Sequence, residues 1–226
     1  EQVAKEMLKD VMLGTNNKDN LIIVTTFSSH IARLKSIIEF GQKLNRKIVF
    51  LGRSLAKYVK AAENVGIVSF SNKIQIVRYS RQIERMLKKV DKDRKKYLVV
   101  CTGHQGESKS VLYKIATGKF KFNLYPEDNV IFSCTTIPTP TNIANREVLE
   151  NELKQTGVRI FKDIHQSGHA AREDLRDFIN LVKPKNVIPS HGTKEMKEAL
   201  ADLGVEMGYK VGKNMFLVNN GSNVCF

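Results

Sequence analysis

Residues 21–51 read LIIVTTFSSHIARLKSIIEFGQKLNRKIVFL, and their pattern decides the expected fold. The apolar run at 21–25 is typical of a buried strand, and residues 31–44 carry apolar side chains at helical spacing. A second apolar run, Lys47–Leu51, predicts another strand. Strands that alternate with helices of this length favour a mostly parallel sheet covered by helices on both faces.

The same alternation continues along the chain. Further strands are predicted at Tyr97–Cys101, 130–134 and 158–163, with weaker candidates at 67–70 and Ile74–Val77. Helices are predicted at 55–62, 82–90, 110–116 and 142–155. The last part differs: it predicts a strand at 186–191, a helix at 193–203 capped by Gly204, and a hairpin formed by 215–218 and 224–226. A weak boundary near Val158 divides the chain into domains 1–157 and 158–226.

Three turns at predicted strand ends carry hydroxyl, amide or guanidinium groups. They are residues 26–30, 52–54 and 102–107. Each turn alone is weak evidence, because loops commonly hold such residues. The carboxyl ends of parallel strands meet at one edge, however, and ligands usually bind there. We therefore expect a cleft that binds phosphate groups, with four candidate binding residues: Arg53, Ser54, Gln105 and Gly106.

Two histidine turns flank a single predicted helix. The first is His165-Gln166-Ser167-Gly168-His169, and the second is Pro189-Ser190-His191-Gly192. We expect a strand–turn–helix–strand unit that brings two imidazoles to one sheet edge, where the helix N-terminus suits a phosphate. In the alternative interpretation, Ser167 caps the helix, both histidines of the first turn only pack nearby, and His191 only hydrogen-bonds a loop.

The composition favours a polyanionic partner. The 226 residues include 37 Lys and Arg against 23 Asp and Glu, a net charge of +14. A basic solvated surface is the alternative, and residues 88–96 are expected to be a solvated helix end. Cys101 and Cys134 are expected to be buried thiols in a reducing cytosol. No apolar run is long enough to cross a bilayer, and Glu1 suggests part of a longer chain.

Six segments in order resemble one nuclease family: TTFSSHIARL, KIVFLGRSL, CTGHQGE, VIFSCTTIP, HQSGHAAREDL and KPKNVIPSHG. They are similar to the β-CASP branch of the metallo-β-lactamase-fold nucleases, and within it to the ribonuclease J family, in its shorter archaeal form. The resemblance implies a Rossmann-like parallel α/β domain. The carboxyl-terminal part of an αββα lactamase domain would follow it.

The resemblance also implies roles for the histidines. His169 would contact the scissile phosphate and assist the leaving group, residues 165–169 would bind the substrate nucleotide, and His191 would hold one of two zinc ions. The family's H-x-H-x-D-H cluster is absent from these residues, so most zinc ligands are expected upstream of Glu1. Thr193 stands where the family commonly has an acid.

The implied activity is zinc-dependent RNA processing and decay. It is 5′→3′ exonucleolysis of 5′-monophosphorylated single-stranded RNA, with endonuclease activity left open, in a cytoplasmic homodimer. These 226 residues alone are expected to be inactive. The alternative class is a non-catalytic module that binds nucleic acid or nucleotide, which an upstream H-x-H-x-D-H would exclude. A small-molecule hydrolase fits the +14 charge and the QGE element poorly.

Overall fold

The structure is a computed structural model that describes residues 1–15, 19–165 and 170–225. The chain divides into two compact units, Glu1–Gln166 and Ser167–Phe226. Within the described residues, no helix is both long and apolar enough to cross a membrane.

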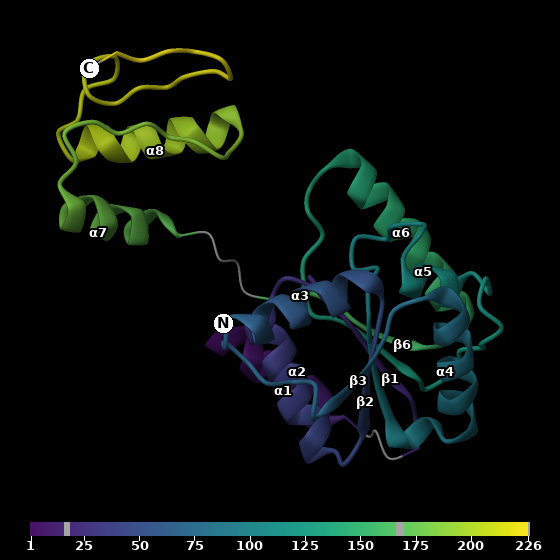
Figure 1. Cartoon of the computed structure of the whole chain (residues 1–226). Helices are drawn as coiled ribbons and strands as arrows, with labels where there is room; N and C mark the ends of the chain where they lie inside the picture. The colour runs from purple at the N-terminus through teal and green to yellow at the C-terminus, as the bar shows by residue number, and fades with distance from the viewer. Residues whose placement is uncertain (16–18, 166–169, 226) are drawn as a thin grey trace. The chain divides into compact units, whose positions relative to one another are not determined.

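The first unit is built on a six-stranded sheet in the order β3-β2-β4-β1-β5-β6 (Figure 1). All of its pairings are parallel, as the sequence predicted. The strands are β1 (Ile22–Thr25), β2 (Lys47–Leu51), β3 (Ile74–Val77), β4 (Tyr97–Cys101), β5 (Asn129–Phe132) and β6 (Arg159–Phe161). The central strand β1 is buried along its whole length because helices cover both faces of a parallel sheet.

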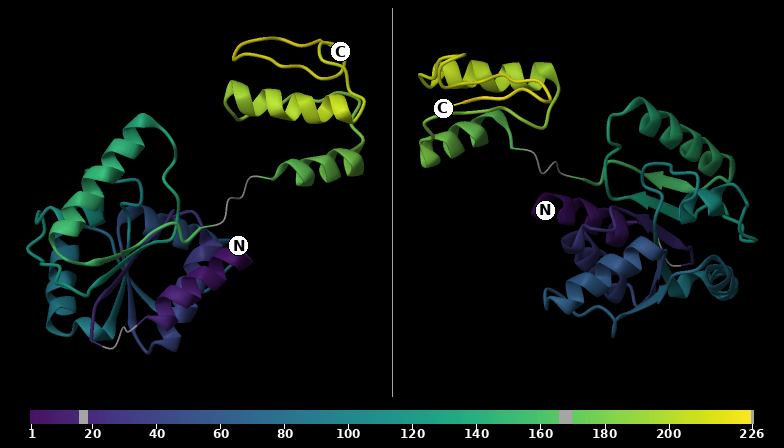
Figure 2. Two further views of the ribbon diagram at one scale, coloured as in Figure 1. Left: turned by 180° about the vertical axis from the view of Figure 1, so that it is seen from behind. Right: turned by 45° about the horizontal axis from the view of Figure 1, so that its top comes forward.

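Helices form a layer on each face of this sheet (Figures 1 and 2). The helices of one layer are α1 (Gln2–Gly14), α2 (Ile31–Lys43) and α3 (Arg53–Asn64), and those of the other are α4 (Ser80–Lys92), α5 (Val111–Ala116) and α6 (Pro140–Gln155). A short 3-10 helix, Arg94–Lys96, precedes β4. Alternate residues of β1 serve opposite cores: Ile22 and Val24 pack with the first layer, and Ile23 packs with the second.

The chain leaves neighbouring strands toward opposite faces. The helices after β1 and β2 cover one face, and those after β3, β4 and β5 cover the other. The loop after β4 therefore leaves toward one face, while the loops after its two neighbours, β2 and β1, leave toward the other. Such divergence opens crevices at the carboxyl edge of the sheet.

The second unit has two helices, α7 (Arg172–Val182) and α8 (Lys194–Glu206), among its described residues. Arg172 and Arg176 of α7 both bind the carboxylate of Glu206 on α8. Outside the helices, the β-type pairing among its described residues consists of bridges from Met215 to Val187 and Val211. The described part of this unit therefore adds no strand to the sheet.

Four local predictions are wrong. Residues 67–70 are not a strand: they follow a left-handed turn at Gly66, and Ile67 is 68% exposed. Residues 186–191 make one bridge instead of a strand, because no extended partner lies beside them in the described unit. The described residues 215–225 form no hairpin. Gly204 does not end α8 but lies inside it, where the Met215 side chain packs against it.

The amino-terminal helix α1 was not predicted. Its buried residues Ala4, Leu8 and Met12 recur every fourth position, which is the signal that would have found it. At the other end of the unit, β6 follows the predicted boundary at Val158 and completes the sheet. The compact unit thus reaches residue 166, and a domain division at 157/158 stays a prediction.

Candidate functional site

The predicted strand-end turns do meet at one edge of the sheet. β2 pairs directly with β4, with Leu51 opposite Cys101, so the turns that follow them are neighbours. Arg53 opens the helix after β2, and Gln105 lies in the loop after β4. The turns after β1 and β2 are linked by a 3.0 Å hydrogen bond between the hydroxyl groups of Ser28 and Ser54.

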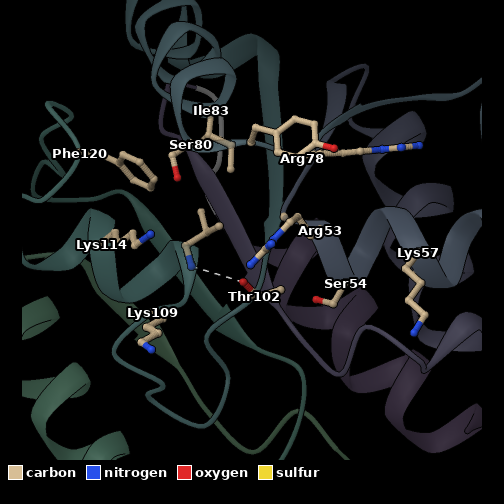
Figure 3. Close-up of a pocket in the computed structure, with 13 residues that line it drawn as sticks. Arg53, Ser54, Lys57, Arg78, Ser80, Ile83, Thr102, Lys109, Lys114 and Phe120 are labelled. Carbon is tan, nitrogen blue, oxygen red and sulfur yellow. Dashed lines mark hydrogen bonds between the residues drawn. The ribbon is translucent and has the colours of Figure 1, made fainter.

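A cavity of about 640 Å³ opens at this edge, where β3, β2 and β4 end. Five of its lining residues are basic: Arg53, Lys57, Arg78, Lys109 and Lys114. No acidic side chain lines it among the described residues. Figure 3 shows the Arg53 guanidinium group reaching inward from α3, with Lys109 and Lys114 across from it. The cavity is therefore a strongly cationic hollow suited to an anion.

The backbone at β2 makes this hollow possible. Gly52 adopts a φ of +133°, which favours glycine, and a Cβ there would lie 3.3 Å from Thr102. The sharp turn starts α3 at Arg53, directly at the cavity. The unpaired amides of a helix N-terminus add to the attraction for anions.

Gln105 and Gly106, by contrast, contact other parts of the protein at the carboxyl edge of the sheet. The Gln105 amide nitrogen donates to the Thr135 carbonyl oxygen at 3.0 Å, and its amide oxygen accepts from the Ile137 N–H at 2.8 Å. A Cβ on Gly106 would lie 2.2 Å from the Asn145 carbonyl oxygen of α6. Gln105 thus holds the loop at 135–137 and Gly106 allows close packing on α6, while direct contact of either residue with RNA stays a prediction.

The segment before the first histidine turn is anchored by Arg33, which is completely buried. Its guanidinium group donates to the carbonyl oxygen and hydroxyl of Ser133 and to the Ile164 carbonyl oxygen, at 3.1, 2.6 and 2.9 Å. The Glu1 carboxylate neutralises it on the other side. Arg33 thus ties the end of β5 to the residue directly before His165.

The environments of two histidines favour the neutral ring. Partial burial lowers the pKa of His165, and the positive charge of Arg33 lowers it further. Burial likewise lowers the pKa of His104, whose ring packs edge-on against Phe27 with centroids 4.1 Å apart, while the Glu107 carboxylate partly opposes this shift. A neutral imidazole can both donate and accept a hydrogen bond.

In the second unit, His191 is exposed and adopts a left-handed backbone with a φ of 55°. A non-glycine residue there is uncommon and is found disproportionately at functional sites. Thr193 caps α8 by accepting from the Met196 N–H. The expectation that both histidine turns end strands of one sheet is wrong, because the described part of the second unit contributes no strand.

Four predicted site residues, Gln166, Ser167, Gly168 and His169, lie outside the described residues. The approach of His169 to His191 therefore stays a prediction. Among the residues that are described, no group of three or more His, Cys, Asp or Glu side chains could hold a metal ion. Those residues do not by themselves fit a zinc centre. Both predicted buried thiols are confirmed, and burial raises the pKa of Cys134 to about 12.

The site prediction did not include Arg78, Lys109 or Lys114. Arg78 directly follows the strand Ile74–Val77, so the same strand-end signal that selected Arg53 would have found it. The two lysines lie beyond the turn after β4 and on the α5 helix, where the sequence carries no comparable signal.

A parallel sheet with a cationic carboxyl edge defines a phosphate-binding α/β protein. The family model described as "Ribonuclease J, beta-CASP domain" matches residues 19–151, and "Zn-dependent metallo-hydrolase RNA specificity domain" matches residues 158–213. The chain belongs to the ribonuclease J family of β-CASP nucleases, as its motifs had suggested.

Relatives from several organisms agree with this assignment. Ribonuclease J of Methanocaldococcus jannaschii is 43% identical over 227 residues, covering 100% of this chain and 51% of the relative. Ribonuclease J of Pyrococcus abyssi is 40% identical over 98% of this chain and 49% of its own length. Ribonuclease J 1 of Streptococcus pyogenes is 31% identical, covering 98% of this chain and 38% of the relative. The chain thus spans about half the length of the first two relatives.

Proposed function

We propose that this chain works as the RNA-holding part of a ribonuclease that hydrolyses phosphodiester bonds in RNA processing and decay. The observation that carries the proposal is the cationic carboxyl edge of the sheet, in a chain of the ribonuclease J family. Basic side chains bind RNA chiefly through its phosphates. The edge therefore suits a strand that is held by its backbone.

In this proposal the substrate is single-stranded RNA with a 5′-monophosphate, degraded from that end. Arg53 and Ser54, which line the cavity, are proposed to contact phosphates. Residues 165–169 are proposed to bind the nucleotide at the cleavage point, with His169 at the scissile phosphate. These roles are supported by the HQSGHA segment and the family membership.

A zinc dependence is supported by the description of the second family model. We propose two ions per active site, with His191 as one ligand. A catalytic zinc ion usually has about three protein ligands. The described residues offer no such cluster, so we propose that most of the zinc ligands come from outside them. What this chain supplies is binding and orientation: the cationic edge holds phosphates, and Arg33 fixes the approach to His165.

The test uses a ribonuclease that carries this chain together with a complete zinc site. His169→Ala should lower the rate of nucleotide release by about 100-fold or more, the usual scale for losing an acid–base or phosphate contact. His191→Ala should instead lower the bound zinc, measured by elemental analysis. The exposed pair Lys88→Ala/Lys92→Ala is the control and should leave both unchanged. RNA of one sequence with a 5′-monophosphate or a 5′-hydroxyl tests the end preference, and sedimentation tests the homodimer.

Full activity of the His169→Ala variant would overturn the catalytic role. The second candidate, a non-catalytic module that binds nucleic acid, is supported by the cationic cavity, which needs no metal ion to attract phosphates. Zinc-loaded protein that binds RNA without releasing nucleotide would support this second candidate.

A further inference from the structure

Of the five basic residues that line the cationic cavity, only Arg53 is among the predicted RNA contacts. Arg78 comes from the end of β3, Lys109 from the loop after β4 and Lys114 from α5. Residues from three connections, far apart in sequence, converge on one hollow (Figure 3).

These charges lack acidic partners, although the Lys114 ammonium group lies 5.7 Å from the centroid of the Phe120 ring. None of the five basic side chains of the cavity takes part in an ion pair within the described part of the chain. Other basic residues do pair, and Arg94 binds both Asp91 and Asp128. Like charges gathered in a hollow repel one another, and a bound anion would relieve that repulsion. The cavity is therefore built to receive negative charge from outside.

Other features of the cavity suit a nucleotide better than a simple inorganic anion. Its volume of about 640 Å³ lies within the range of small-molecule sites. Ser54, Ser80 and Thr102 bring hydroxyl groups, and Ile83, Val111 and Phe120 give an apolar wall. The Tyr79 ring lines the cavity and is 59% exposed, so a base can stack on it.

We propose that this cavity is a nucleotide-binding site, which holds a phosphate between Arg53, Lys109 and Lys114 and a base against Tyr79. The nucleotide is either free or part of an RNA chain. The cavity lies at the end of β4, whereas His165 follows β6. Three strand spacings separate β4 from β6, a span of about 14 Å along the sheet. The proposal shares Arg53 with the proposed function, but it concerns binding alone and needs no turnover.

The experiment measures binding to the 226-residue chain without added metal, so that hydrolysis does not interfere. The probes are AMP, inorganic phosphate, and a tetranucleotide with or without a 5′-phosphate. Calorimetry measures the binding affinity of each probe. Lys109→Ala/Lys114→Ala should weaken nucleotide binding by about tenfold, because two solvent-accessible charge contacts are lost. For the tetranucleotide, the negative slope of log K against log salt should become shallower by about 1.4, since each phosphate contact on a single strand contributes ~0.7.

The matched control is Lys88→Ala/Lys92→Ala, which removes two exposed positive charges at the far end of α4. It should change neither the affinity nor the slope. Arg78→Gln, on a different loop, gives a second independent variant, and circular dichroism checks that each variant is folded. Tyr79→Ala should weaken the binding of AMP more than the binding of inorganic phosphate, because only AMP carries a base.

The arms separate the two sources of the nucleotide. AMP that binds and competes with the tetranucleotide indicates a free nucleotide, and tetranucleotide binding without AMP binding indicates an RNA chain. Equal weakening by the cavity pair and the control pair would show general charge attraction and overturn the proposal. Unchanged binding in the cavity variants would overturn it as well. Full hydrolysis by a His169→Ala ribonuclease would overturn the proposed role of His169, while nucleotide binding that depends on Lys109 and Lys114 would still support this site.

Discussion

At the scale of single residues, several groups at the sheet edge act on the protein itself. Gln105 is 5% exposed, and both the nitrogen and the oxygen of its side-chain amide hydrogen-bond the backbone of residues 135–137. The Arg33 guanidinium group donates hydrogen bonds to Ser133, Ile164 and Glu1. Breaking such a buried network is costly because the remaining partner is left unpaired. The strand-end motifs thus include residues that hold the edge together as well as residues that line the cavity.

Gly106 gives the sharpest prediction at this scale. Gly106→Ala should destabilise the first unit by about 3 kcal/mol or more, because left-handed strain is joined by a clash with backbone. The added Cβ would lie 2.2 Å from the Asn145 carbonyl oxygen, at a φ of +78°. Urea unfolding followed by circular dichroism measures the loss.

Gly118→Ala is the matched control. Gly118 has a similar φ of +67°, but a Cβ there would meet nothing within 4 Å. Only the strain of the left-handed backbone remains, about 1–2 kcal/mol. Equal losses in the two variants would mean that α6 moves aside and that the close approach has no energetic weight.

At the scale of elements, the sheet depends on a helix that the sequence analysis left unassigned. Leu8 and Met12 of α1 are fully buried in the same core as Ile22 and Val24 of β1. This helix completes the layer that α2 and α3 begin. It therefore contributes to the stability of the strands whose carboxyl ends carry the candidate site.

Truncating a buried side chain of α1 tests this contribution. Leu8→Ala should lower the free energy of unfolding of the first unit by about 2–5 kcal/mol, through lost burial and the cavity that remains. Val3→Ala on the same helix should change it by at most about 0.5 kcal/mol, since Val3 is 57% exposed. Chemical denaturation of both variants checks the difference, and a neutral Leu8→Ala would show that α1 is peripheral to the core.

At the scale of the whole molecule, the two units differ in what they supply. The first holds the sheet and the cationic cavity, and the second holds His191 at its exposed left-handed turn. The net charge of +14 belongs to the chain as a whole and favours polyanions at long range. Binding is therefore expected to be a property of this chain even where hydrolysis is not.

The 226-residue chain should bind RNA weakly and in a salt-sensitive way, but neither retain zinc nor degrade RNA. A stable site usually needs about three protein ligands, and the described residues hold no cluster of that size. The measurements are zinc content after dialysis and incubation of 5′-monophosphorylated RNA with added zinc or manganese. Stoichiometric zinc and nucleotide release that both disappear in His191→Ala would contradict this prediction.

The sequence by itself determined the parallel α/β class, most of the strands, the strand-end turns and the family. Buried strands and amphipathic helices leave a local apolar period, and sequence motifs need no coordinates to be read. The carboxyl-terminal part was harder to predict. The extended character of residues 186–191 is local, but a strand also needs a partner, and the described unit offers only the bridge to Met215.

The tertiary structure alone decided the order β3-β2-β4-β1-β5-β6 and the pairing of β2 with β4. It also decided that Lys109 and Lys114 face the same hollow as Arg53, and that Gln105 is occupied by the loop at 135–137. These outcomes depend on contacts between residues far apart in the chain, such as the Thr26 hydroxyl donating to the Ser133 carbonyl oxygen across 107 positions. A local pattern sets which residues form a strand or helix, but only packing of the whole sheet sets which ends meet.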